Sequence, residues 1–253
     1  YLTNLGVIPW IKVDKGAKKL SGTEGEKVTE GLDGLADRLT EYYELGARFA
    51  KWRVVITIGD TEPSGTCVSA NAHALARYAA LCQDHGLVPI VEPEILMDGT
   101  HSIADSFVVT EDVLHTVFLE LYAQNVEFEG MVLKPNMVLS GYECPDQAGV
   151  EEVAELTVTV LKRCVPAAVP GIAFLSGGQS DEHATAHLNA MNQLLGNNSP
   201  WNLTFSYGRA LQAPALKAWG GLAKNVPQAR EAFYKRAKLN SLATKGEYSA
   251  EME

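Results

Sequence analysis

Lysines and carboxylates follow several apolar segments of this sequence, and they are the residues most able to carry out covalent chemistry. Lys134 is the most informative of them, because large apolar residues precede it and Pro135 follows it. Apolar surroundings favour the neutral form of a lysine side chain, and a neutral amine is a nucleophile towards a carbonyl carbon. The alternative is a lysine whose stem packs on apolar surface while its ammonium group reaches water.

Besides Lys134, two pairs of charged residues lie near the ends of apolar segments. Glu92 and Glu94 flank a proline at the end of one segment, where a carboxylate can serve as a general acid or base. Lys51 and Arg53 are two residues apart, so a strand would place both on one face. Ion pairs with a purely structural role explain these four residues equally well.

Two glycine-containing turns precede predicted helices, at Leu175-Ser176-Gly177-Gly178-Gln179 and at Ser206-Tyr207-Gly208-Arg209. Free backbone N–H groups at a helix start, together with Ser176 and Arg209, are suited to bind a phosphate. Taken singly, each turn is better explained as a tight connection between a strand and a helix. Together they favour a phosphate site, because α/β barrels commonly bind phosphate with the loops after their last two strands.

The sequence predicts no metal site and no cofactor. His183 and His187 have the i, i+4 spacing of zinc ligands on a helix, but the accompanying HExxH glutamate and a third ligand are missing. No zinc-like spacing connects the cysteines, so we expect reduced thiols at Cys67, Cys82, Cys144 and Cys164. Motifs for nucleotide binding or for a nucleophilic serine are also missing.

Short, nearly continuous apolar runs predict the buried strands that must position these residues. The runs are Gly6–Val13, Phe49–Ile58, Leu87–Glu92, Gly130–Lys134, Ile172–Leu175 and Asn202–Tyr207. Helical patterns lie between them, with Gly46 and Gly86 as stop signals, and two helices are expected at Arg209–Trp219 and Pro227–Leu242. The strands recur about every 30 to 42 residues, which indicates βα units and a parallel sheet.

Composition restricts the possible partners. The chain has 253 residues, is 46% hydrophobic and carries a net charge of −10. This acidity disfavours nucleic acid and anionic membranes as partners, and no apolar run reaches the length of a membrane span. We therefore expect one domain over residues 1–253 of a cytoplasmic protein, with a flexible C-terminal end at residues 245–253.

The ordered motifs resemble those of the class I fructose-bisphosphate aldolases over nearly the whole chain. They are Ile11-Lys12-Val13-Asp14-Lys15-Gly16, Ala50-Lys51-Trp52-Arg53, Ile90-Val91-Glu92-Pro93-Glu94-Ile95-Leu96, Leu133-Lys134-Pro135-Asn136-Met137, Leu175-Ser176-Gly177-Gly178-Gln179-Ser180 and Ser206-Tyr207-Gly208-Arg209-Ala210-Leu211-Gln212.

The resemblance implies metal-free, reversible cleavage of fructose 1,6-bisphosphate to dihydroxyacetone phosphate and glyceraldehyde 3-phosphate in glycolysis. Catalytic roles fall to Lys134 as the Schiff-base lysine, Glu92 as general acid/base and Lys51 as electrostatic support. One phosphate would be held next to the ketone, and the other phosphate or the hydroxyls further away. The residues implied for substrate binding are Ser176, Gly177, Gly208 and Arg209 near the ketone, and Lys12 and Arg53 at the distal end. The family is often tetrameric, which implies a homotetramer.

The family fold is a (β/α)8 TIM barrel, and this chain accounts for only about six of the eight βα units. The resemblance places the missing units at the N-terminus, which would leave two sheet edges open and lower the stability of the chain. The family's C-terminal tyrosine tail is also missing after Glu253. Two alternatives stay open: another Schiff-base aldolase such as a transaldolase, and a non-catalytic binding or scaffold protein with a degenerate barrel.

Overall fold

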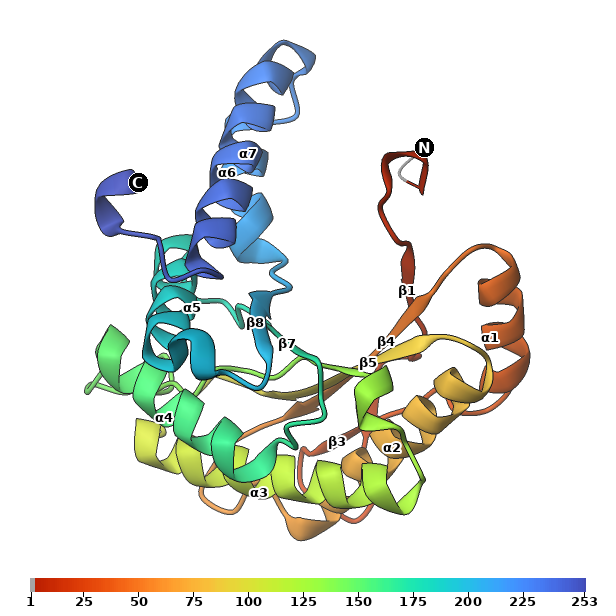
Figure 1. Ribbon diagram of the computed structural model, residues 1–253. Coiled ribbons are helices and arrows are strands. Elements are labelled where there is room, and N and C mark those ends of the chain that lie inside the picture. The colour runs from red at the N-terminus through yellow and green to blue at the C-terminus, as the bar shows by residue number, and fades with distance from the viewer. Residues whose placement is uncertain (1–2) are drawn as a thin grey trace.

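A six-stranded parallel sheet with the order β1-β4-β5-β6-β7-β8 forms the centre of the computed structural model, which describes residues 3–253 (Figure 1). Its strands are β1 (Trp10–Lys12), β4 (Phe49–Ile56), β5 (Val88–Ile95), β6 (Val132–Leu133), β7 (Gly171–Phe174) and β8 (Asn202–Phe205). Each of these six strands falls within or overlaps one of the predicted apolar runs, so the predicted α/β fold with a parallel sheet is confirmed. Among residues 3–253 the sheet does not close into a barrel, because β1 and β8 each pair with one neighbour only.

Of the seven α-helices of residues 3–253, five lie around the outside of the curved sheet and two form a hairpin that projects beyond β8 (Figure 1). The outer helices are α1 (Leu35–Glu44), α2 (Gly65–Asp84), α3 (Ile103–Ala123), α4 (Val150–Cys164) and α5 (Asp181–Leu195), and the hairpin consists of α6 (Arg209–Trp219) and α7 (Val226–Ala243). Short 3-10 turns occupy Thr3–Leu5, Phe128–Gly130, Gly196–Asn198, Ala223–Asn225 and Ala250–Met252. The two helices predicted after β8 correspond to α6 and α7, and their predicted ends are confirmed to within one residue. No helix in residues 3–253 is long and apolar enough to cross a membrane.

Local sequence signals set the helix ends. The hydroxyls of Ser64, Ser102 and Ser180 accept a hydrogen bond from the backbone N–H three residues later, at 3.1, 3.2 and 3.1 Å. These bonds satisfy backbone donors that have no partner in the first turn of α2, α3 and α5. Gly46 and Gly86 have φ angles of 99° and 71° just after α1 and α2, which confirms them as the predicted stop signals.

Two details of the strand prediction are wrong. The antiparallel pair β2 (Ala17–Lys19) and β3 (Lys27–Thr29) was not predicted, because β2 is exposed at every position and therefore carries no apolar pattern. Two predicted strands are also too long at their N-terminal ends: β1 begins only after Pro9, and β6 is only two residues long. Residues 128–130 form a 3-10 turn that delays the start of β6.

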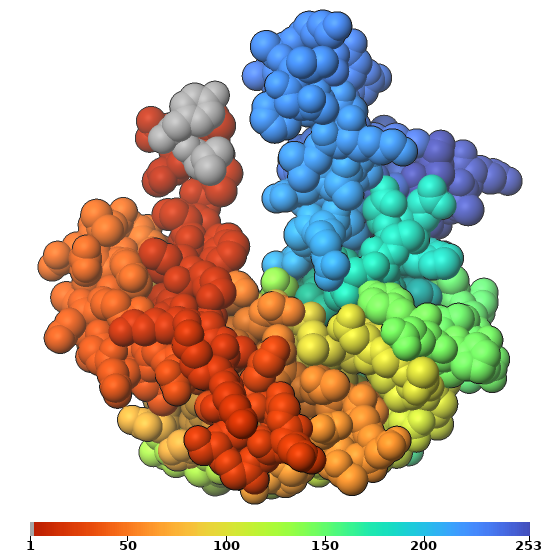
Figure 2. Space-filling view, turned by 180° about the vertical axis from the view of Figure 1, so that it is seen from behind, coloured from red at the N-terminus to blue at the C-terminus, as the bar shows by residue number. Residues whose placement is uncertain are grey.

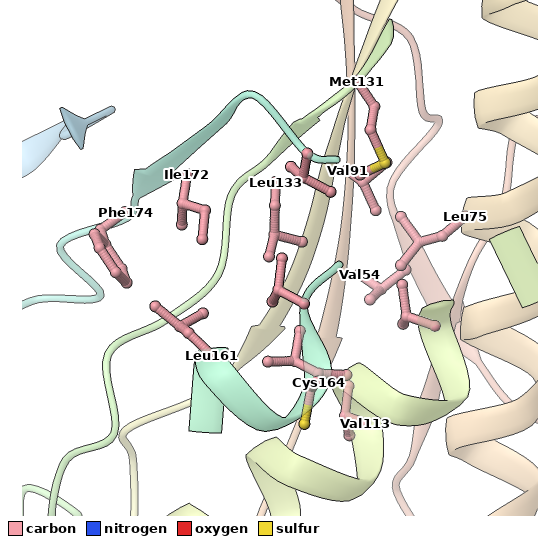
Figure 3. Close-up of a cluster of buried hydrophobic side chains, with 14 of the residues drawn as sticks. Val54, Leu75, Val91, Val113, Met131, Leu133, Leu161, Cys164, Ile172 and Phe174 are labelled. Carbon is pink, nitrogen blue, oxygen red and sulfur yellow. The ribbon is translucent and has the colours of Figure 1, made fainter. Parts of the chain in front are cut away.

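The main core lies between the sheet and the outer helices. Figure 3 shows Val54, Val91, Leu133 and Ile172 of successive strands facing side chains of the outer helices, such as Leu161 of α4. Successive side chains of a strand point to opposite faces. The residues directly beside these in sequence, including Arg53, Glu92 and Lys134, therefore lie on the inner face of the sheet, away from the helices.

The C-terminal segment packs against two helices. The backbone N–H of Tyr248 donates to Asn189 of α5 at 2.9 Å, and the Glu253 carboxylate pairs with Arg236 of α7 at 2.5 Å. Tyr248 itself is buried. These contacts hold the segment in the structure, and its flexibility in solution stays a prediction.

The N-terminal segment before β1 exposes apolar side chains. Leu5, Val7, Ile8 and Trp10 are 64%, 47%, 57% and 55% exposed. Figure 2 shows a wide opening between this segment and the α6–α7 hairpin. The two unpaired edges of the sheet therefore lie on either side of an opening that the described residues do not fill.

Candidate active site

Glu92 lies between the two lysines that the sequence predicts to be catalytic. One carboxylate oxygen, Oε2, is 2.6 Å from Lys51 Nζ, and the other, Oε1, is 3.0 Å from Lys134 Nζ. All three residues are buried, with 3% exposure for Glu92, 8% for Lys51 and 9% for Lys134. A carboxylate this close to a buried amine can take up or release a proton at the atom that would attack a carbonyl.

A second layer of charge surrounds this triad. Arg53 is ion-paired with Glu94, and this hydrogen bond is the main reason that the pKa of Arg53 lies above its usual value. Lys12 is ion-paired with Asp14, and the second carboxylate oxygen of Asp14 accepts the backbone N–H of Arg53 at 3.2 Å. Lys12 and Arg53, the predicted distal pair, are therefore linked through Asp14.

The ion pairs given as the structural alternative for Lys51, Arg53, Glu92 and Glu94 are thus present. They do not conflict with the catalytic interpretation, because Glu92 also reaches Lys134. Asp14 was not assigned to the site from the sequence, and Glu94 was a candidate acid/base carboxylate to which the family resemblance gave no role. The alternation that places Glu92 on the inner face also applies to Glu94 and was the available signal for it.

The chain around Lys134 explains why its side chain reaches Glu92. The backbone N–H of Lys134 donates to Val91 of β5 at 2.8 Å, and Pro135 has no N–H with which to extend β6. The carbonyl of Pro135 accepts from Leu175 at 3.1 Å, just after β7. Beyond Pro135, a side chain replaces the backbone hydrogen bonds between the strands: Oδ1 of Asn136 accepts from the backbone N–H of Ile95 at 3.2 Å. The position of Lys134 is therefore fixed from both neighbouring strands.

The two glycine turns lie side by side at the ends of β7 and β8. Gly177 and Gly178 have φ angles of 62° and 108°, a conformation that favours glycine, and Ser176 is buried. Gly208 immediately precedes α6, and Arg209 is its first residue. A Cβ atom on Gly178 would lie 3.2 Å from Nη2 of Arg209, so the guanidinium group of one turn faces the backbone of the other.

Tyr142 also reaches this region, although no sequence signal pointed to it. It lies in the loop after β6, and its hydroxyl donates to the carbonyl of Gly177 at 2.8 Å. Partial burial raises the pKa of Tyr142, and the nearby charge of Arg209 acts in the opposite direction. Loop residues carry no periodic pattern, so only the structure places Tyr142 at the turn.

The two histidines on α5 contact each other and a glutamine side chain. The rings of His183 and His187 are 6.0 Å apart, and Nδ1 of His187 is 2.6 Å from the side-chain oxygen of Gln179. Among residues 3–253, no group of three histidine, cysteine or acidic side chains is arranged to hold a metal ion. The four cysteines are unbonded, and burial raises the pKa of Cys67 to about 11.

Comparisons with known proteins identify the family of this chain. The family model described as fructose-bisphosphate aldolase class-I matches residues 1–253. A probable class 1 fructose-bisphosphate aldolase of Xanthomonas axonopodis pv. citri (strain 306) is 60% identical over 249 residues, which are 98% of this chain and 74% of that protein. The cytosolic fructose-bisphosphate aldolase 4 of Arabidopsis thaliana is 56% identical over 98% of this chain and 63% of its own length.

The same family is found among solved structures. A co-crystal structure of fructose-bisphosphate aldolase from Plasmodium falciparum has a TM-score of 0.96 at 53% identity and covers 98% of this chain and 72% of that one. None of these matches supports a transaldolase or a non-catalytic scaffold protein. The chain belongs to the class I fructose-bisphosphate aldolase family and is a lyase.

Proposed function

We propose that this aldolase cleaves fructose 1,6-bisphosphate through a Schiff base on Lys134. The observation that carries the proposal is the buried contact between Lys134 Nζ and Glu92 at 3.0 Å, with Lys51 on the other carboxylate oxygen at 2.6 Å. A nucleophilic amine and a proton carrier are then in direct contact. The ammonium group of Lys51 stabilises the carboxylate between proton transfers.

The reaction follows from these roles. Glu92 takes a proton from the Lys134 ammonium group, and the neutral amine adds to the C2 ketone. The protonated Glu92 then gives its proton to the hydroxyl of the carbinolamine, which leaves as water and gives an iminium ion. The electron pair of the C3–C4 bond then moves into the iminium group while Glu92 removes the proton of the C4 hydroxyl, so that an enamine forms and glyceraldehyde 3-phosphate departs. Glu92 gives this proton to C3 of the enamine, and water hydrolyses the resulting iminium ion, which releases dihydroxyacetone phosphate and restores Lys134.

The substrate would be oriented by its phosphates. Ser176, Gly177, Gly208 and Arg209 would hold the phosphate next to the ketone, because two adjoining glycine turns present backbone N–H groups beside one guanidinium group. Lys12 and Arg53 would contact the distal phosphate or the hydroxyls. Basic side chains collected in one place allow an acidic protein to bind a dianionic group.

Trapping of the imine tests the central role of Lys134. The chain is incubated with dihydroxyacetone phosphate, reduced with borohydride and digested, and the adduct is located by peptide mass. We expect the adduct on Lys134, its loss in Lys134→Met, and its retention in Lys162→Met, which replaces an exposed lysine on α4. An adduct confined to another lysine, or none at all, would refute the Schiff-base proposal.

Chelation tests whether the reaction depends on a metal. Since an iminium ion is itself the electron sink, the rate of trapping and of aldol cleavage should be the same with and without EDTA. A loss of activity that added divalent metal restores would contradict the proposed mechanism.

The assembly and setting are also proposed. We infer that the sheet is part of a (β/α)8 barrel in which further strands pair with the free edges of β1 and β8, a view supported by the TM-score of 0.96 to a family structure. A homotetramer follows from the family resemblance. A cytoplasmic location is supported by plant relatives that are named cytosolic.

A further inference from the structure

Tyr142 connects three loops at the carboxyl ends of the strands. Its backbone N–H donates to the carbonyl of Met97, after β5, at 2.8 Å. Its hydroxyl donates to the carbonyl of Gly177, after β7, at 2.8 Å, and it lies 3.4 Å from the Met97 sulfur. Tyr142 itself belongs to the loop after β6. A single side chain therefore links the loop that carries the glycine turn to the loops of β5 and β6.

Gln179 closes the turn that Tyr142 contacts, because its backbone N–H and its side-chain Nε2 both donate to the Ser176 carbonyl at 3.0 Å. Gly177 and Gly178 both have positive φ angles, and glycine backbone is the most flexible in the chain. The hydrogen bond to the Gly177 carbonyl fixes the peptide plane that joins these two residues. Because the Gly178 N–H belongs to the same peptide unit, its direction is fixed as well.

Tyr142 also faces the same side of the turn as Arg209. A Cβ atom added to Gly178 would lie 2.6 Å from the Tyr142 hydroxyl and 3.2 and 3.3 Å from the two terminal nitrogens of Arg209. The phenol and the guanidinium group thus both adjoin Gly178. The charge of Arg209 also affects the pKa of Tyr142, in the direction expected for a nearby cation.

We propose that Tyr142 is a positioning residue for the phosphate next to the ketone, and that it acts by holding the Gly177–Gly178 turn against Arg209. The inference rests on the proposed function, because it requires that turn to bind a phosphate. Tyr142 would determine how well a phosphorylated ketone binds, and it would leave the chemistry at Lys134 unchanged.

The test compares two ketones that differ only in the phosphate. Dihydroxyacetone phosphate and unphosphorylated dihydroxyacetone are each trapped on Lys134 with borohydride over a range of concentrations. In Tyr142→Phe, which removes only the hydroxyl, the half-saturating concentration of the phosphorylated ketone should rise about three- to tenfold, the range for one lost hydrogen bond. The value for dihydroxyacetone should stay within about twofold, since that ketone does not use the turn.

Inorganic phosphate provides a second measurement. The concentration of phosphate that halves trapping of dihydroxyacetone phosphate, measured at the half-saturating ketone concentration of each protein, should rise in Tyr142→Phe by a factor similar to that for the ketone. Tyr248→Phe is the matched control, because it also removes one phenolic hydrogen bond, at 3.0 Å to Glu253, but in the C-terminal segment. It should change neither value.

The outcomes separate this inference from the proposed function. If neither ketone labels Lys134 in the unmodified chain, the proposed function fails and this inference fails with it. If the unmodified chain is labelled and Tyr142→Phe matches it with both ketones, only the role of Tyr142 is refuted. An equal loss for both ketones would also refute it, because a general structural defect does not distinguish phosphorylated from unphosphorylated substrates.

Discussion

Glu92 has two roles in the proposed mechanism, one in stabilising the buried site and one in proton transfer. It forms ion pairs with two buried lysines, at 2.6 Å from Lys51 and 3.0 Å from Lys134, and its position suits it to exchange protons with a substrate bound at Lys134. A buried carboxylate is stable only when cations or hydrogen-bond donors surround it. The same contacts that form the ion pairs therefore also place Glu92, the proposed proton carrier, beside Lys134, the proposed nucleophile.

Glu92→Gln tests this double role. The amide retains the shape of the side chain and loses its ability to exchange protons, so kcat for cleavage of fructose 1,6-bisphosphate should fall by about 10²- to 10⁴-fold. Steady-state kinetics measure the change, with Glu129→Gln as a control at an exposed position outside the site. A kcat within twofold of the unmodified value would exclude Glu92 as the general acid/base.

His187 predicts a pH dependence of stability. Burial, with a smaller effect from His183, lowers the pKa of His187 to about 4, below its usual value of 6.5. As the pH falls through 6.5, the unfolded chain takes up a proton that the folded chain does not bind until about pH 4. Stability should therefore decrease over this window, by about 3 kcal/mol for this residue, and be unaffected above it.

Urea unfolding at a series of pH values measures that decrease. His187→Asn should reduce the slope between pH 6.5 and 4, because asparagine does not titrate and still offers an N–H group to Gln179, which contacts His187 at 2.6 Å. His115→Asn is the control, because it removes a histidine on α3 and leaves His187 in place. In this variant the change of stability with pH should match that of the unmodified chain. Equal slopes in both variants and the unmodified chain would contradict the assignment.

At the scale of elements, the strand ends determine where the site residues lie. β6 pairs with β5 at only two positions, since Pro135 prevents a longer ladder. Asn136 replaces the missing backbone contacts: it accepts from Ile95 N at 3.2 Å and donates to the Thr110 hydroxyl at 3.3 Å. The side chain thus joins β5, β6 and α3 two residues after Lys134, the proposed Schiff-base lysine.

Asn136→Ala should therefore reduce the free energy of unfolding by about 1–3 kcal/mol, because a buried backbone N–H and a buried hydroxyl lose their partner. Asn202→Ala removes an exposed hydrogen bond to the carbonyl of Pro170 and should cost less than about 0.5 kcal/mol. Chemical denaturation gives both values. Similar costs for the two variants would show that Asn136 does not hold these elements together.

The elements also show what the sequence can and cannot predict. Apolar runs reveal buried strands, so the six strands of the sheet and the acidic and basic residues at their ends could be predicted. The exposed β2 strand has no such pattern, and its pairing with β3 depends on contacts distant in sequence. Tyr142 was missed for a similar reason, since a loop residue obtains its role from the loops it contacts.

The whole molecule adds a feature that no single element has, namely a parallel sheet with two free edges among residues 3–253. The segment that leads into edge strand β1 exposes Val7 and Ile8, at 47% and 57%. Exposed edges with apolar side chains pair with edges of other molecules. Such pairing is open-ended, so it differs from the closed tetramer proposed above.

We therefore expect the chain of residues 1–253 to form species larger than a tetramer as its concentration rises, and sedimentation velocity can detect them. Replacing both Val7 and Ile8, which lie just before β1, with lysine should suppress these species, because charges beside an edge strand disfavour its pairing with another chain. Lysines at Leu119 and Tyr122, which are 71% and 76% exposed on α3, add the same charge away from any edge and should leave the large species in place. If both pairs of lysines suppress them equally, general charge repulsion explains the effect and the free edge does not.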